Sequence, residues 1–209
     1  DKKNNKGKCK ALIVNSGNAN AHTGIEGIKT IDSYVKKLSK KIKCKKSEIL
    51  VSSTGVIGEI FNPNIINNQI ENLHLKNKTN LLEAAKTIMT TDTYPKTIIK
   101  KIYIDKKTIN IYGFAKGSGM IYPNMGTMLV YIFIESNISN AILKKILNKN
   151  LEDTFNSITV DGDTSPNDSS CLVATGEGGV KINKSSNLEK RFRKEVNDLF
   201  YELSRMLIK

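Results

Sequence analysis

The stretch GFAKGSGMIYPNMGTMLVYIFIE, residues 113–135, decides how this chain is interpreted. A glycine-rich loop with one lysine, Lys116, leads to the pair Gly126-Thr127, and the apolar run 128–134 follows. A threonine that heads a buried strand, directly after a glycine without a Cβ atom, is how a self-cleaving nucleophile would be built. Cleavage before Thr127 would free its α-amine, and a threonine paired with its own terminal amine is an activated nucleophile. The alternative is an ordinary strand residue after a turn.

The composition is that of a globular chain able to form one domain or two small ones. It has 209 residues, of which 39% are hydrophobic and 25% charged, which is an ordinary balance for globular domains. No apolar stretch is long enough to span a bilayer, and the first ten residues are polar and basic, so we expect neither a membrane span nor a signal peptide. Three widely spaced cysteines and two histidines suggest neither a disulfide framework nor a metal site. A cytoplasmic location is expected.

The chain is basic, with a formal net charge of +13 from 33 basic and 20 acidic residues. The densest lysine run, residues 36–46, lies at the end of a predicted amphipathic helix. Such a face can contact phosphates. However, no aromatic residues for base stacking lie between the lysines, which favours a solvated face and no nucleic-acid partner. A non-catalytic basic module that binds nucleic acid remains the alternative.

Apolar runs and helical periodicity alternate along the chain and predict a mixed α+β architecture of layered sheets and helices. Strands are expected over residues 10–14, 48–52, 100–104, 108–114, 128–134 and 171–174. Helices are expected to end near residue 42, to cover residues 64–73, 81–89 and 142–156, and to run from residue 188 onward. The two strands between residues 100 and 114 are expected to form a hairpin.

Polar blocks that contain glycine, hydroxyl or amide groups follow or precede the predicted strands. They are VNSGNANAHTG (14–24), SSTGVIGE (52–59), MTTDTYPK (89–96), KGSGMIYPNMGT (116–127) and ITVDGDTSPND (158–168). Loops of this kind at strand ends are typical walls of a small-molecule site.

These blocks, in this order, resemble the bacterial glutamate N-acetyltransferase family of arginine biosynthesis, also called ornithine acetyltransferase. The resemblance covers nearly the whole chain, from Ala11 to Gly176. It implies a layered αββα sandwich similar to N-terminal-nucleophile enzymes. It also implies that residues 1–209 are one partial catalytic domain, cut between Gly126 and Thr127 into an α part (1–126) and a β part (127–209).

The resemblance further implies a reaction and its residues. Thr127 is the implied nucleophile, which takes the acetyl group of N-acetylornithine as an ester and passes it to glutamate. Thr54 and Gly55 match the oxyanion-hole positions, while Thr90 and Lys116 match substrate contacts. From the residues alone, a strand-ending turn at Thr54 and Gly55 and a surface position for Lys116 would be the simpler interpretations.

No cofactor or metal is implied, although some family members accept acetyl-CoA as a co-substrate. Relatives assemble as α/β pairs, so a heterotetramer is expected. The family continues beyond both ends of this chain, and we expect the 209-residue piece alone to be inactive or poorly stable. An N-terminal-nucleophile amidohydrolase, in which water receives the acyl group, is a further alternative.

Overall fold

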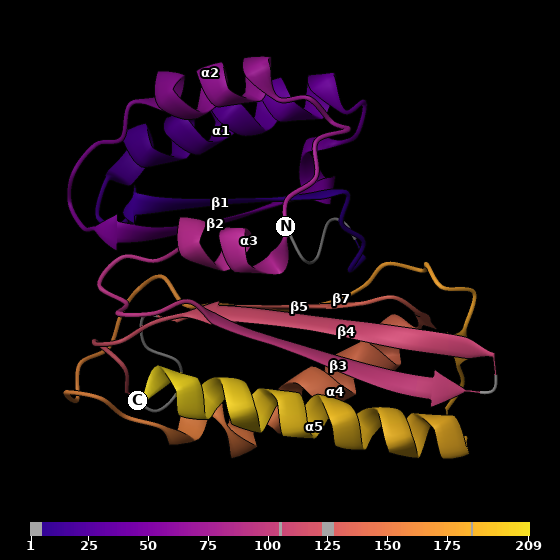
Figure 1. Ribbon diagram of the computed structural model, residues 1–209. Helices are drawn as coiled ribbons and strands as arrows, with labels where there is room; N and C mark the ends of the chain where they lie inside the picture. Colours follow the sequence, from indigo (N-terminus) through magenta and orange to yellow (C-terminus); the bar gives the residue numbers. More distant parts are fainter. Residues whose placement is uncertain (1–5, 105, 123–127, 185) are drawn as a thin grey trace. The chain divides into compact units, whose positions relative to one another are not determined.

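A computed structural model describes residues 6–104, 106–122, 128–184 and 186–209 (Figure 1). The predicted cleavage junction, Gly126 and Thr127, lies outside the described residues. The chain divides into two compact units, Asp1–Thr79 and Asn80–Lys209.

The first unit is built on a pair of parallel strands, β1 (Ala11–Asn18) and β2 (Ile49–Val56). Parallel strands need a crossover between them, which here is the helix α1 (Gly24–Lys41) followed by a short 3₁₀ turn. The helix α2 (Pro63–Asn72) packs against α1. Its first turn is favoured locally because proline occupies the N1 position and the preceding Asn62 side chain accepts the Asn64 N–H.

Both strands of this unit run further than predicted. The predicted strands end at residues 14 and 52, but the parallel register continues through Ser16 opposite Thr54 and Gly17 opposite Gly55. The polar blocks that follow the apolar runs are therefore, at their start, paired strand rather than free loop.

The second unit contains a four-stranded sheet in the order β3-β4-β5-β7. Its first three strands are antiparallel neighbours, and β7 pairs with β5 in parallel. The strands are β3 (Lys96–Ile104), β4 (Lys107–Lys116), β5 (Leu129–Ile134) and β7 (Ser169–Ala174). The hairpin predicted between residues 100 and 114 is confirmed, and the apolar run before Ile134 is the buried strand β5.

Among the described residues, three α-helices, a short 3₁₀ turn and a small strand pair complete this unit. They are α3 (Leu81–Thr87), α4 (Asn140–Asp153), α5 (Asn187–Leu207), the turn Phe155–Ser157 and the pair β6 (Asn137–Ile138) with β8 (Lys181–Ile182). Within the unit, α4 and α5 lie on one face of the sheet and α3 lies on the other (Figure 1). The final helix expected from residue 188 is confirmed as α5.

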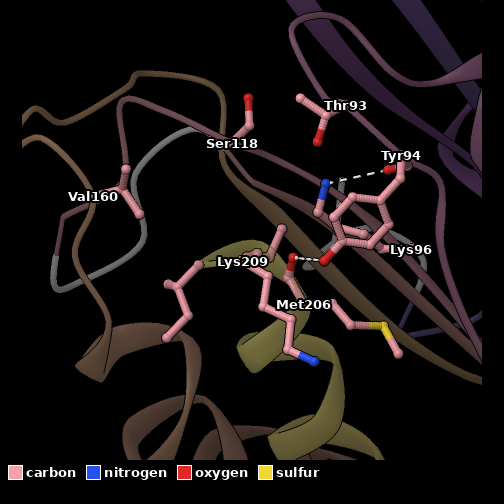
Figure 2. A pocket seen from close by; sticks show the side chains of 9 residues that line it. Thr93, Tyr94, Lys96, Ser118, Val160, Met206 and Lys209 are labelled. Atoms are coloured by element: carbon pink, nitrogen blue, oxygen red, sulfur yellow. Dashed lines mark hydrogen bonds between the residues drawn. The ribbon is translucent and has the colours of Figure 1, made fainter.

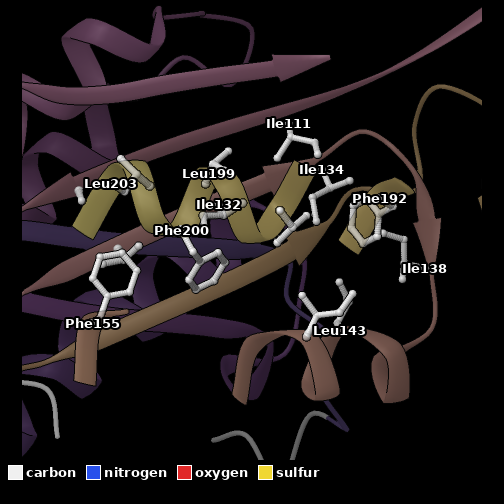
Figure 3. Packing of buried hydrophobic residues seen from close by; sticks show 14 of the residues in the cluster. Ile111, Ile132, Ile134, Ile138, Leu143, Phe155, Phe192, Leu199, Phe200 and Leu203 are labelled. Carbon is white, nitrogen blue, oxygen red and sulfur yellow. The ribbon is translucent and has the colours of Figure 1, made fainter. Parts of the chain in front are cut away.

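The core of the second unit lies between α5 and the sheet (Figure 3). Along α5 the fully buried side chains recur at helical spacing: Phe192, Val196, Leu199, Phe200 and Leu203. Gly113 of β4 lets this helix approach closely, since a Cβ there would lie 3.0 Å from side-chain atoms of Leu199 and Leu203. Among the described residues, no helix is both long and apolar enough to cross a membrane.

Phe200 and Tyr201 provide a matched test of this core. Phe200 is fully buried, whereas its neighbour Tyr201 is 56% exposed. Truncation of Phe200 to alanine should lower the free energy of unfolding by about 3–5 kcal/mol, because it removes a buried ring and leaves a cavity. Tyr201→Ala should cost less than about 1 kcal/mol. Chemical denaturation of both variants measures the difference, and equal losses would contradict this packing.

Candidate active site

Lys116, the last residue of β4, has a buried side chain (2% exposed) that ends in a polar contact. Its Nζ donates a hydrogen bond of 2.8 Å to Oγ1 of Thr90, an exposed residue just after α3. The structure thus brings together the two residues that the sequence predicts as substrate contacts. The simpler interpretation of Lys116 as one more surface lysine is excluded by its burial.

Burial lowers the pKa of the Lys116 ammonium, because desolvation penalises the charged form. The nearby carboxylates of Asp92 and Asp168 oppose this effect, while the charge of Lys96 adds to it. An ammonium in such a setting gains from a further anion beside it, and the carboxylate of an amino acid is one such group.

Asp92 and Lys96 form a buried ion pair that the sequence reasoning missed. Lys96 Nζ lies 2.7 Å from Asp92 Oδ1, and the two side chains are 2% and 1% exposed. The same carboxylate accepts the N–H groups of Gly117 at 2.7 Å and Thr90 at 3.3 Å. The signal available in the sequence was an acid and a base four residues apart inside a block otherwise poor in charge.

The pKa of Asp92 reflects these contacts. Desolvation by burial would raise it, but the hydrogen bonds from Lys96 and Gly117, together with the Lys96 charge, outweigh that effect and lower it. Asp92 is therefore held as a carboxylate.

The block at residues 158–168 contacts the chain on both sides of the predicted junction. Asp161 Oδ2 accepts the N–H of Met120 at 2.7 Å, and Asp168 Oδ1 accepts the N–H of Met128 at 2.8 Å. Residues 126 and 127 between them are not described, so the roles of Gly126 and Thr127 stay predictions.

Thr54 and Gly55, the predicted oxyanion-hole residues, belong to the first unit, whereas Thr90 and Lys116 belong to the second. Thr54 is a buried residue of β2. Gly55 has φ +129°, and a Cβ there would lie 2.3 Å from the carbonyl carbon of Gly17 and 2.6 Å from the Asn18 nitrogen. A side chain at this position would therefore collide with the backbone of β1.

The second unit contains a cavity of about 260 Å³ (Figure 2). Its lining includes Tyr94, Lys96, Ser118 and the residues from Met206 onward, but neither Thr90 nor Lys116. Tyr94, which precedes β3, donates its hydroxyl hydrogen to the Met206 carbonyl and so connects this segment to the end of α5. Within the described ranges, His, Cys, Asp and Glu side chains form no group of three that could hold a metal ion.

These observations define an α+β protein in which a buried lysine forms a hydrogen bond with a threonine beside a glycine-rich loop. The model of the ArgJ family matches residues 1–209, and the chain belongs to this family. The family resemblance stated from the sequence is thereby confirmed.

Individual relatives agree with this assignment. The chain is 41% identical over 209 residues to the arginine biosynthesis bifunctional protein ArgJ of Bartonella quintana, a match that covers 97% of this chain and 50% of that protein. It is also 41% identical over 204 residues to the ArgJ protein of Bradyrhizobium diazoefficiens, covering 95% and 49%. The chain thus spans about half the length of the curated relatives it matches.

A solved structure matches as well. The crystal structure of the arginine biosynthesis bifunctional protein argJ from Bacillus halodurans has a TM-score of 0.52 and 37% sequence identity, over 57% of this chain and 63% of that chain. This match confirms the α+β class expected from the sequence.

Gly55 and Gly58 allow the close approach of β1 and β2 to be tested. Both have positive φ, but nothing lies within 4 Å of a Cβ built on Gly58. Gly58→Ala should cost about 1–2 kcal/mol of unfolding free energy from backbone strain alone. Gly55→Ala should cost about 1–3 kcal/mol more, because the backbone of Gly17 must also move. Denaturation curves that coincide for the two variants would show that the strands do not approach this closely.

The lowered pKa of Asp92 predicts how acid affects stability. The stabilisation is fully present above the ordinary aspartate pKa of about 3.9 and is lost as the pH falls through the lower folded-state value. Below about pH 4, the unfolding free energy should therefore fall more steeply for the unmodified protein than for Asp92→Asn. Exposed Asp153→Asn controls for the loss of one negative charge. Parallel acid curves for the unmodified protein and Asp92→Asn would contradict the prediction.

Proposed function

We propose that the protein to which this chain belongs transfers the acetyl group of N-acetylornithine to glutamate, in the cyclic pathway of arginine biosynthesis. The observation that carries the proposal is the buried Lys116 ammonium bonded to the Thr90 hydroxyl. Membership of the ArgJ family and relatives named for arginine biosynthesis support it.

The donor and the acceptor share the chemistry that this site is suited to bind. Both carry an α-carboxylate next to the α-nitrogen that gives up or receives the acetyl group. A compact ammonium suits a carboxylate. The Thr90 hydroxyl, which accepts from Lys116, still has its own hydrogen to donate. One anchor can therefore place either α-nitrogen at the same point, as a ping-pong cycle requires.

Thr127 is the proposed nucleophile. Attack of its Oγ on the Gly126 carbonyl gives an ester that water hydrolyses, and the α-amine of Thr127 is released. In the mature enzyme this amine takes the hydroxyl proton while Oγ attacks the acetyl carbonyl. The C–N bond of the donor breaks, the proton passes to the departing nitrogen of ornithine, and an acetyl ester remains on Thr127. The α-amine of glutamate then attacks the ester and regenerates the hydroxyl.

Thr54 and Gly55 are the proposed donors to the oxyanion of each tetrahedral intermediate, where one lost donor typically costs about 10²–10³ in rate. The site needs no cofactor, and acetyl-CoA is a candidate second donor of the acetyl group. We further propose a cytoplasmic enzyme whose α and β chains come from one precursor and assemble as a heterotetramer.

The intact mass of the complete protein tests the proposal. Two fragments that separate between Gly126 and Thr127 are expected, together with acetyl transfer from N-acetylornithine to glutamate. Thr127→Ala should remain one chain and lose transfer. Thr108→Ala, at the far end of β4, should still be cleaved and active. A single uncleaved chain that transfers acetyl at full rate would refute the mechanism.

Omission of glutamate distinguishes transfer from hydrolysis. When glutamate is absent, an acetyltransferase should release about one equivalent of ornithine per site and little acetate, because the acetyl group stays on Thr127 as an ester until an amine acceptor arrives. Equal rates of ornithine release with and without glutamate would identify an amidohydrolase instead.

A further inference from the structure

Asp92 lies where two loops of the second unit meet. One loop lies between α3 and Lys96, the first residue of β3, and the other begins at Lys116, where β4 ends. Three contacts join these loops. Asp92 accepts the Gly117 N–H, Lys116 Nζ donates a hydrogen bond to Thr90 Oγ1, and the hydroxyl oxygens of Thr91 and Ser118 lie 2.9 Å apart. The loop that carries the lysine is thus attached to the threonine loop at three successive positions.

The Asp92 carboxylate is the charged centre of this attachment. It accepts hydrogen bonds from the Gly117 N–H, directly after Lys116, and from the Thr90 N–H. A third bond comes from Lys96 Nζ at the start of β3. Hydrogen bonds to a buried carboxylate are stronger than neutral ones, so they hold backbone positions well.

The negative charge of Asp92 also favours the protonated form of Lys116. Lys96 and Lys116 are both 2% exposed, and two buried ammonium groups disfavour each other's charge. Among the described residues, the charged side chains that act on Lys116 include Asp92, Lys96 and Asp168, and the Asp92 carboxylate has the largest effect of these three. Without it, the charged form of Lys116 loses a carboxylate that stabilises it.

We propose that Asp92 is a positioning residue for the acetyl-transfer site, which fixes Thr90 and Lys116 relative to each other and keeps Lys116 as the ammonium that binds the substrate α-carboxylate. This inference rests on the proposed function. Asp92 does not touch substrate; it acts through the Gly117 and Thr90 amides and through its charge.

A simpler role for Asp92 would be that of counterion to Lys96, and a double variant separates the two roles. Removal of one partner leaves the other buried and unpaired, whereas replacement of both by apolar or neutral groups is often tolerated. Asp92→Asn alone should therefore lower both the thermal midpoint and the activity. Asp92→Asn combined with Lys96→Met should recover the thermal midpoint if the pair only balances its own charge.

If Asp92 positions the site, both variants of the complete protein should lose activity. In Asp92→Asn and in the double variant, we expect kcat/KM for N-acetylornithine and for glutamate to fall together by about 100-fold, a loss that a misplacement of about 1 Å can cause. In Asp92→Asn the alkaline limb of the kcat/KM profile should move to lower pH, because Lys116 then loses its proton more readily; it should move less in the double variant, which also lacks the opposing charge of Lys96. Asp153→Asn, an exposed control, should match the unmodified protein in both measurements. Wild-type kcat/KM in the double variant would overturn the proposal.

A readout that does not need turnover separates this inference from the proposed function. The reaction of Lys116 with acetic anhydride, followed across pH by mass spectrometry of its peptide, should begin at lower pH in Asp92→Asn than in the unmodified protein. Absence of acetyl transfer in the unmodified protein would refute the function, while this labelling shift still supports the control of Lys116 by Asp92. Identical labelling curves would refute that control, whatever the enzyme does.

Discussion

The burial of a lysine ammonium is the constraint on which the candidate site depends. Lys116 and Lys96 both lie inside the second unit, and the desolvation of each must be offset by polar contacts. Asp92 offsets one through an ion pair and influences the other through its charge. Those contacts come from residues 90–96 and 116–117. If the two segments separated, buried charges would lose their partners, and this energetic penalty holds the site in its geometry.

The sheet explains why the site and the core do not compete for space. Side chains alternate along β4, so Gly113 meets α5 while Phe114 and Lys116 point to the opposite face. On that face Phe114 packs with Tyr131 and Phe133 of β5 at ring distances of 5.3 and 6.3 Å. The main hydrophobic core therefore lies on the α5 side of the sheet. Lys116 lies on the opposite face, at the end of a strand that aromatic packing holds on that face.

Much of the fold could be predicted because its signals are local. The apolar run before Ile134, the β3–β4 hairpin and α5 follow from periodicity and turn residues. The spacing of Asp92 and Lys96 was a signal for a pair, but the burial of that pair could not be predicted, since it depends on contacts with distant parts of the chain such as Gly117. The close approach at Gly55 depends equally on the register with β1. Lys116 and Thr90 were identified only through the family motifs, because nothing in their spacing of 26 residues indicates a contact.

The strand that follows the proposed nucleophile is fixed at its first described residue. Met128 donates its N–H to Asp168 and accepts the Ser169 N–H through its carbonyl, which extends the parallel β5–β7 ladder by one position. The Asp168 carboxylate here takes the place of the backbone carbonyl that a neighbouring strand would offer to the Met128 N–H. Because this acceptor is charged, the hydrogen bond is stronger than one to a carbonyl. Asp161 holds Met120 in the same way on the preceding side. Asp161 and Asp168 therefore anchor the chain at Met120 and at Met128, before and after Thr127, which gives two carboxylates of this block a structural role.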